Sequence, residues 1–353
     1  MDPGVACPGR AEARLNVGIV KLSSLGDVVH TLPVASALRR AFPRARIVWL
    51  VEAREAALLR EHPALDEVIV VDTRGWRRLL RAGTCGRLAA EVRQTRRHIR
   101  DARLDVVIDA QGLLKSALLV RWARADVRVG FAASWSKEPL AALVTNCRVD
   151  PPASAVHVVD QYRALLQPLG VSDTSPVFHL PTSARAEARM DEVFAACALG
   201  ARQGVVTLNP GAGKPAKRWP AEHFRALSRG LLERGMRVVI AWGPGELDLA
   251  RAIHAGLPPG TVLAPPTDLD DLLALLRRSA LLVAGDTGPL HLAVALGIPT
   301  VAVFGPTSPD RNGPYGAPPG RVLRARDGRV ESVVPEAALA AATAALAGEA
   351  VTA

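Results

Sequence analysis

The sequence predicts an α/β protein made of two doubly wound, Rossmann-like domains. Apolar runs of strand length alternate with segments of helical apolar spacing from Val17 onward, which is typical of parallel sheets covered by helices on both faces. The alternation stops once, within residues 169–186, where turn residues cluster and the periodicity fails. The length of 353 residues suits two domains of about 150–180 residues each.

The first domain is expected over residues 15–172. Its first strand leads through the turn "SSLGD" into a helix at residues 28–42, and helical segments separate most of the later strands. Such βαβ units are right-handed and build a parallel sheet. The strands predicted for this domain are at residues 17–22, 46–51, 67–71, 104–109 and 127–131.

The second domain is expected over residues 173–333, opening with a helix at 187–198. Its predicted strands are at residues 204–209, 236–242, 261–263, 280–285 and 300–304. Residues 334–353 carry a final apolar helix that we expect to fold back toward the first domain. Residues 1–14 lack the apolar core of a signal peptide and are expected to be a disordered extension.

Composition and charge restrict the possible partners. The formal net charge is +10, and this excess favours acidic partners such as phosphates, nucleic acid or anionic lipid. Aromatic residues make up only 4% and no recognition motif is visible, so nucleic-acid binding is disfavoured. The four cysteines have no metal-ligand spacing and are expected to be reduced thiols of a cytoplasmic protein. No apolar run of about 18 residues predicts a membrane span, although a membrane surface remains a possible partner.

Asp27 is the first candidate functional residue. It ends the turn "SSLGD", with Gly26 allowing the chain to bend, at the edge of the sheet where open α/β folds bind ligands. The residue could be an ordinary cap of the following helix or a base for a hydroxyl group. The local sequence leaves both interpretations open.

The turn "NPGAGKPAKRWP" after the strand at 204–209 is a weak phosphate site. Gly211, Gly213 and Ala216 have dinucleotide-fold spacing, but Pro215 interrupts the helix that such a site requires, which argues against a nicotinamide oxidoreductase. The turn does not match a Walker A phosphate-binding loop either, because Pro215 follows Lys214 where that motif has serine or threonine. A glycine-rich turn remains whose amides, with Lys217 or Arg218, could meet an anion. A solvated turn is the alternative.

The stretch "GDTGPLHLAVALG" at residues 285–297 predicts a strand end followed by a short helix. The amides of Thr287 and Gly288 would lie at the amino end of that helix, where the dipole favours a diphosphate. Asp286 would repel phosphate, so a functional Asp286 should face a lysine or a sugar hydroxyl; a helix cap is the alternative. His291 lies in the first turn and could be simply a packed residue.

Five stretches together resemble the lipopolysaccharide heptosyltransferase family, in particular the type that adds the first heptose. They are "KLSSLGDVVHTLP", "VIDAQGLLKSALL", "KEPLAAL", "KRWPAEHF" and "GDTGPLHLAVALGIPTVAVFGPTSP". The resemblance implies a GT-B fold, ADP-L-glycero-β-D-manno-heptose as donor, Kdo-lipid A as acceptor, and inversion without a metal or cofactor. It also implies a peripheral enzyme on the cytoplasmic face of the inner membrane. A heptosyltransferase acting on a later core sugar, or a nucleotide-sugar 2-epimerase of similar fold, is the alternative.

The resemblance also implies roles for individual donor-site residues. Asp27 matches the family's base and Lys217 its phosphate contact, while Asp286, Thr287 and Gly288, with His291 nearby, match its heptose and diphosphate contacts. Glu246 is the expected ribose ligand. Where some relatives have two threonines, this chain has Ala212 and Gly213, so Gly213 would contribute only its backbone amide.

The acceptor is anionic, so its site should be basic. The candidates are Arg74, Arg77 and Arg78, because arginine captures carboxylates and phosphates in a bidentate manner, together with Lys115, which follows a strand end. Ser24 and Gly26 of the "SSLGD" turn complete the predicted acceptor site. For the arginines, an exposed solvated helix face is the alternative.

Overall fold

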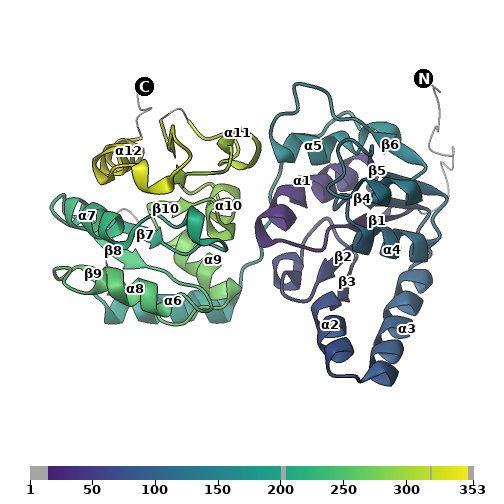
Figure 1. The fold of residues 1–353 in the computed structure, drawn as a ribbon, viewed down its shortest axis with the longest axis horizontal. Coiled ribbons are helices and arrows are strands. Elements are labelled where there is room, and N and C mark those ends of the chain that lie inside the picture. Colours follow the sequence, from purple (N-terminus) through teal and green to yellow (C-terminus); the bar gives the residue numbers. More distant parts are fainter. Residues whose placement is uncertain (1–14, 200–203, 319, 349–353) are drawn as a thin grey trace. The chain divides into compact units, whose positions relative to one another are not determined.

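The computed structural model describes residues 15–199, 204–318 and 320–348, and the chain divides into two compact units, Met1–Pro181 and Thr182–Ala353. Each unit contains one six-stranded parallel sheet with helices on its faces (Figure 1). The strand orders are β3-β2-β1-β4-β5-β6 and β12-β11-β10-β7-β8-β9. Both are the doubly wound order in which the first strand of the unit lies at the centre. The predicted fold class is therefore confirmed.

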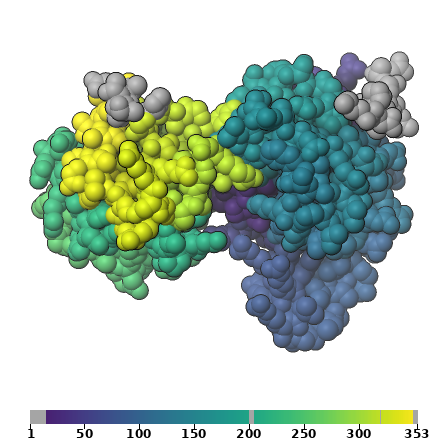
Figure 2. All heavy atoms as spheres, turned by 45° about the horizontal axis from the view of Figure 1, so that its top comes forward, coloured from purple at the N-terminus to yellow at the C-terminus, as the bar shows by residue number. Residues whose placement is uncertain are grey.

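The first sheet forms from nearly continuous apolar runs that are buried on both faces. Its strands are β1 (Asn16–Val20), β2 (Arg46–Glu52), β3 (Glu67–Val71), β4 (Val106–Asp109), β5 (Val127–Phe131) and β6 (Cys147–Val149). The helices are α1 (Leu25–Ala41), α2 (Thr73–Arg81), α3 (Cys85–Asp101), α4 (Leu114–Ala123) and α5 (Val158–Ala164), with 3₁₀ turns η1 (Ala56–Leu59), η2 (Pro139–Val144) and η3 (Gln167–Leu169). Helices α2 and α3 project from the body of this unit as a pair, seen as the blue lobe in Figure 2.

The second unit repeats this plan. Its strands are β7 (Val205–Asn209), β8 (Arg237–Ile240), β9 (Thr261–Leu263), β10 (Leu281–Gly285), β11 (Thr300–Phe304) and β12 (Val322–Arg324). Its helices are α6 (Ala184–Ala196), α7 (Ala221–Leu232), α8 (Leu247–His254), α9 (Leu269–Arg277), α10 (Gly288–Ala295), α11 (Pro309–Asn312) and α12 (Pro335–Ala347), with 3₁₀ turns η5 (Pro215–Lys217) and η6 (Val330–Ser332). Among the described helices, none combines the length and the apolar character needed to cross a bilayer.

The boundary between the units lies later than residue 172. Asp173 accepts a hydrogen bond from Arg40, and the carbonyl of Val177 accepts one from Ser36, so this segment runs along α1 and belongs to the first unit. The edge strands β6 and β12 were not predicted, because each has only three residues and one of them is an arginine. The three-residue edge strand β9 was predicted, because its residues are all apolar or β-branched. The expected disordered extension, residues 1–14, lies outside the described residues.

The final helix α12 packs within the second unit. Its small side chains Ala338, Ala341, Ala342 and Ala345 are buried in the core of the second unit, where the helix contacts α7, β10 and β11. A smooth alanine face lets α12 approach its neighbours closely, and Leu339 reaches the surface of α7 at Gly230. The expectation that this helix folds back toward the first domain stays a prediction.

Candidate active site

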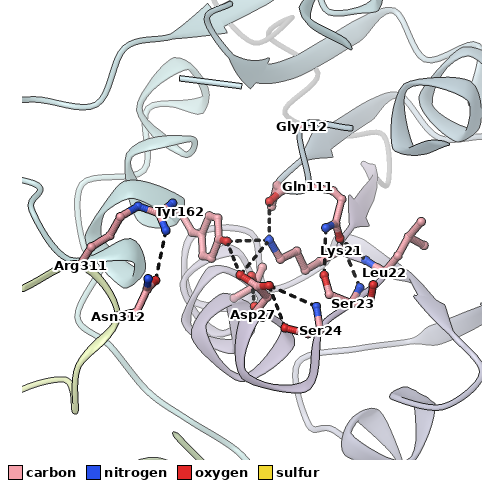
Figure 3. Close-up of polar contacts among 12 residues, drawn as sticks. Lys21, Leu22, Ser23, Ser24, Asp27, Gln111, Gly112, Tyr162, Arg311 and Asn312 are labelled. Atoms are coloured by element: carbon pink, nitrogen blue, oxygen red, sulfur yellow. Dashed lines mark hydrogen bonds and ion pairs between the residues drawn. The ribbon is translucent and has the colours of Figure 1, made fainter. Parts of the chain in front are cut away.

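Asp27 is the third residue of helix α1, one turn further into the helix than the sequence predicted. Strand β1 ends at Val20 and α1 begins at Leu25, so Gly26 lies inside the first helical turn rather than in a sharp bend. The Asp27 carboxylate accepts hydrogen bonds on Oδ2 from the Ser24 amide at 3.2 Å and from the Ser24 hydroxyl at 3.0 Å (Figure 3). These bonds help to cap the helix, but they use only one carboxylate oxygen.

The other oxygen of Asp27 faces a buried lysine and a tyrosine. Lys21 is 1% exposed, and its Nζ donates to the carbonyl of Ala110 at 2.8 Å and to the Tyr162 hydroxyl at 2.6 Å. The Tyr162 hydroxyl in turn donates to Asp27 Oδ1 at 3.0 Å, and Lys21 Nζ lies 3.8 Å from the same oxygen (Figure 3). Capping alone requires no buried ammonium group, so this arrangement indicates a further role for Asp27.

The surroundings of Asp27 keep its carboxyl group ionised. Burial raises the pKa of Asp27, but the positive charges of Lys21 and Lys137 and the hydrogen bonds from Ser24 outweigh it, and the pKa lies well below its usual range. The side chain keeps 22% of its surface exposed. Asp27 is therefore an anion that an approaching hydroxyl group can reach.

The loop after β4 fixes the turn that carries Asp27. Buried Asp109 accepts hydrogen bonds from the amides of Gln111 at 2.9 Å and Gly112 at 3.1 Å and from the hydroxyl of Ser116 at 2.9 Å. The Gln111 side chain accepts from the amides of Leu22 and Ser23 and donates to the Ser23 carbonyl at 2.9 Å. The ends of β1 and β4 are thus joined by one amide side chain.

The predicted acceptor residues divide into two groups. Lys115 lies beside the Asp27 turn, with Nζ 3.5 Å from the Ser23 hydroxyl and 4.0 Å from the buried Glu52 carboxylate. Arg74, Arg77 and Arg78 are exposed on α2. Within the described residues, no hydrogen bond joins these arginines to the Asp27 turn; Arg78 instead lies 3.7 Å from Asp72 on its own helix.

In the second unit, Asp286 faces a lysine, as the sequence led us to expect. Lys217 donates to Asp286 Oδ2, the Thr307 hydroxyl donates to the same oxygen at 3.0 Å, and His291 Nε2 lies 3.8 Å from Oδ1. Burial raises the pKa of Asp286, but His291, Lys217 and Thr307 outweigh it and hold this pKa at about 2. Asp286 and Lys217 therefore form an ion pair at neutral pH.

Packing of the "KRWP" segment sets the position of Lys217. Trp219 is buried and donates from Nε1 to the carbonyl of Val333 at 2.8 Å. A Cβ at Gly285 would lie 3.2 Å from the Lys217 carbonyl, so a glycine there lets η5 approach the end of β10. Thr287 directly precedes α10, and the amide of Gly288 lies in the first turn of this helix, as predicted. Pro220 is the N-cap of α7.

Glu246 lies against two glycine backbones at neighbouring strand ends. Its Oε2 accepts from the Gly243 amide at 2.9 Å, and a Cβ at Gly211 would lie 2.0 Å from that oxygen. The absence of a side chain at Gly211 therefore makes room for the Glu246 carboxylate. Gly213 is exposed, and a Cβ there would meet no other atom within 4 Å. These contacts place Glu246 beside the glycine-rich turn.

Comparison with known proteins identifies the family. The model of "Glycosyltransferase family 9 (heptosyltransferase)" matches residues 92–331. The chain belongs to glycosyltransferase family 9. A family 9 relative from Pseudomonas aeruginosa, lipopolysaccharide heptosyltransferase 1, is 37% identical over 86% of this chain and 82% of its own. Its namesake from Escherichia coli K12 is 34% identical over 86% of this chain and 91% of its own.

Solved structures agree with the family 9 assignment. The E. coli heptosyltransferase WaaC with ADP superposes with a TM-score of 0.78 at 31% identity, covering 94% of this chain and all of that one. The same enzyme with ADP-2-deoxy-2-fluoro heptose gives a TM-score of 0.73 at 31% identity, covering 92% of this chain and 97% of that one. The family 9 chain is therefore a glycosyltransferase of the GT-B type, and the predicted resemblance is confirmed.

The sequence analysis missed four residues of the Asp27 site. Lys21 was counted within an apolar strand, although a lysine that ends a buried run is itself a signal, because an ammonium group is rarely buried without a partner. Asp109 and Gln111 stand in "VIDAQG", which served only as a family motif. Tyr162 carried no local signal, because the fold alone brings α5 next to the end of β1.

Proposed function

We propose that this chain transfers L-glycero-D-manno-heptose from ADP-heptose to the Kdo residue of Kdo-lipid A. Heptose transfer in the synthesis of the lipopolysaccharide core follows from family 9 membership and from the relatives named heptosyltransferase 1. The choice of the first heptose rests on those two relatives, and the Kdo acceptor is what the resemblance of the sequence motifs implies. Inversion and independence from metals and cofactors are parts of the proposal.

The observation that carries the mechanism is the anionic Asp27, held by Tyr162, Lys21 and Ser24. Inverting transfer is a single displacement in which the acceptor hydroxyl attacks the anomeric carbon and gives up its proton. In this proposal Asp27 accepts that proton, a role that contributes about 10²- to 10⁴-fold to the rate. A strongly lowered pKa makes Asp27 a modest base. Such a base suffices because the hydroxyl becomes acidic only as its bond to the electron-poor carbon forms.

The departing ADP needs positive charge that is already in place. Lys217 and the amides of Thr287 and Gly288 would supply it at the diphosphate, where the amino end of α10 adds its dipole. Asp286 would hold Lys217 in position through their ion pair, and its second oxygen would accept a hydrogen bond from a heptose hydroxyl. Glu246 would bind the ribose, and the Gly213 amide would bind a phosphate oxygen. His291 would orient Asp286.

The acceptor carries phosphates and Kdo carboxylates. Lys115 would bind one of these anions beside the Asp27 turn, with Ser24 and Gly26 lining the approach, while the arginines Arg74, Arg77 and Arg78 on α2 would attract the headgroup from farther away. Because this acceptor is a lipid, we place the enzyme on the cytoplasmic face of the inner membrane as a peripheral protein. Nucleic acid has no role in this proposal.

The decisive experiment measures ADP release from ADP-heptose with and without Kdo-lipid A. The Asp27→Asn variant keeps the shape and the capping position but cannot accept a proton, and we expect its kcat to fall about 10²- to 10⁴-fold. The kcat of Asp27→Ala should fall by the same factor, and this variant should also lose more thermal stability. If Asp27→Asn keeps most of its turnover, Asp27 is only a capping residue. Turnover of an acceptor that already carries heptose, but not of Kdo-lipid A, would instead assign a later transfer.

A further inference from the structure

Helix α4 exposes leucines where a solvent-facing helix normally carries polar residues. Leu114 and Leu118 are 52% and 47% exposed, and they lie one turn apart on the same helical face. The next residue of this face is the exposed Arg121. A helix that packs only inward would expose charged and polar side chains here, so the face has the composition of a contact surface.

The 3₁₀ turn η2 extends this apolar surface. Its Leu140 and Leu143 are 64% and 71% exposed, and η2 packs against α4. The Leu114 amide donates to Glu138 Oε2 at 2.5 Å, which ties the start of α4 to the residue preceding η2. We call Leu114, Leu118, Leu140 and Leu143 the leucine patch. Single exposed leucines are ordinary, but four on two adjoining elements form a patch of the kind that marks interaction sites.

Basic side chains lie beside the leucine patch. Arg148 is exposed and donates from Nε to the Ala142 carbonyl of η2 at 3.0 Å, while Arg128 donates from Nε to the Val144 carbonyl at 2.7 Å. Residues 114–148 contain six lysines and arginines against two acidic residues. The neighbouring helix α3, which packs against α4, exposes four more arginines: Arg87, Arg93, Arg96 and Arg97.

We propose that the leucine patch docks on an anionic lipid bilayer, with the leucines entering the interface and the neighbouring basic groups contacting headgroup phosphates. An anionic membrane surface attracts apolar side chains flanked by arginine and lysine, because the leucines can enter the acyl region while the basic groups pair with the headgroup phosphates. A protein partner would have to be both strongly acidic and apolar. The inference rests on the proposed function, in which the acceptor is a lipid.

The leucine patch adjoins the catalytic turn. Gln111, which holds Ser23 of that turn, lies three residues before Leu114. Lys137, two residues before η2, is close enough for its charge to act on Asp27. A bilayer on the patch would therefore present a sugar headgroup to Asp27 while the acyl chains of the acceptor stay in the membrane.

Vesicle co-sedimentation tests the docking surface without any substrate. The double variant Leu140→Gln/Leu143→Gln removes apolar surface without changing charge, and Leu80→Gln on α2 is the matched control, because Leu80 is 61% exposed and lies outside the patch. On vesicles of phosphatidylcholine with phosphatidylglycerol, we expect the double variant to bind at least about tenfold more weakly than the wild type. The control should bind like the wild type, and vesicles of phosphatidylcholine alone should bind every form poorly.

Activity assays separate this inference from the proposed function. With Kdo-lipid A embedded in anionic vesicles, the double variant should show a KM raised about tenfold or more, while its kcat/KM for a de-acylated, water-soluble Kdo acceptor stays at the wild-type value. Equal vesicle binding by the double variant and the wild type would overturn the docking surface even if transfer is normal. A wild-type dimer that the double variant loses, seen by light scattering, would assign the patch to self-association instead. Vesicle binding by a wild type that transfers no heptose would contradict the proposed function alone.

Discussion

The Tyr162 hydroxyl bridges the Lys21 ammonium and the Asp27 carboxylate, at 2.6 Å from Lys21 Nζ and 3.0 Å from Asp27 Oδ1. Because the ammonium can only donate, the hydroxyl accepts from Lys21 and must direct its single proton to Asp27. Tyr162 therefore fixes the orientation of one carboxylate oxygen.

Replacing Tyr162 with phenylalanine should lower kcat about tenfold, the cost of one lost hydrogen bond to a charged group. The KM for ADP-heptose should not change, because the ring still packs beside Lys21. Steady-state kinetics with the donor varied, together with the melting temperature, would measure both effects. An unchanged kcat in a stable Tyr162→Phe variant would show that Asp27 needs no such support.

Lys137 should set the acid limit of activity. Its charge contributes to the lowered pKa of Asp27, so Lys137→Gln should raise this pKa, and the acid limb of the kcat profile should move to higher pH. The sign follows because transfer requires the ionised carboxylate. Arg93→Gln, a substitution at an exposed position of α3, should not shift the acid limb of the kcat profile. A de-acylated acceptor is the appropriate substrate for these profiles.

Gly211→Ala should weaken donor binding with little loss of stability. The new Cβ would lie 2.0 Å from the Glu246 carboxylate, which is the end of a flexible side chain and can move away. We expect the KM for ADP-heptose to rise several-fold. Gly204→Ala, at a position with open space before the same strand, is the control. If the donor KM of Gly211→Ala equals that of wild type, Glu246 has no part in binding ADP-heptose.

The Lys217–Asp286 pair should make stability depend on pH in the acid range. The pKa of Asp286 is lowered from 3.8 to about 2 in the folded chain, so its contribution is complete above about pH 4 and is lost as the pH falls through about 2. The difference in the free energy of unfolding between wild type and Asp286→Asn should therefore shrink below pH 4. Urea titrations at several pH values measure this difference. A difference that stays constant or grows as the pH falls would contradict the ion pair.

Chelation should leave activity largely intact. In the proposed mechanism, Lys217 and the amino end of α10 neutralise the departing diphosphate, a task for which other transferases use Mg²⁺. ADP release should therefore continue at nearly the same rate in excess EDTA. Complete loss on chelation, restored by added Mg²⁺, would require a different account of the leaving group.

Much of the fold was predictable because its strands are long apolar runs. The runs at 67–71, 127–131 and 300–304 match β3, β5 and β11 at both ends, since an apolar run of strand length is a clear local signal. β6 and β12 were not predicted, because each of these three-residue runs contains an arginine, whereas the equally short edge strand β9 has only apolar and β-branched residues. The unit boundary was misplaced because contacts such as Arg40–Asp173 leave no trace in the local pattern.

The candidate site was predictable where one short motif carries several contacts. The "GDTG" motif predicted Asp286 next to the amino end of a helix. Because its carboxylate would repel a phosphate, a lysine or a sugar hydroxyl was expected beside it, and Lys217 is that lysine. The Asp27 cluster was predictable only in part, because Lys21, Gln111 and Tyr162 come together from β1, the end of β4 and α5. No local periodicity reports such a convergence of separate segments.

The hydrogen bond from Trp219 to the Val333 carbonyl links the donor loop to a residue near the end of the chain. During synthesis, the indole can find its acceptor only after Val333 has left the ribosome, so the loop with Lys217 is completed only after 114 further residues have been added beyond Trp219. A nascent chain that stops before Val333 would carry every residue assigned to donor and acceptor, and yet it would lack the carbonyl that anchors Trp219 and so positions Lys217.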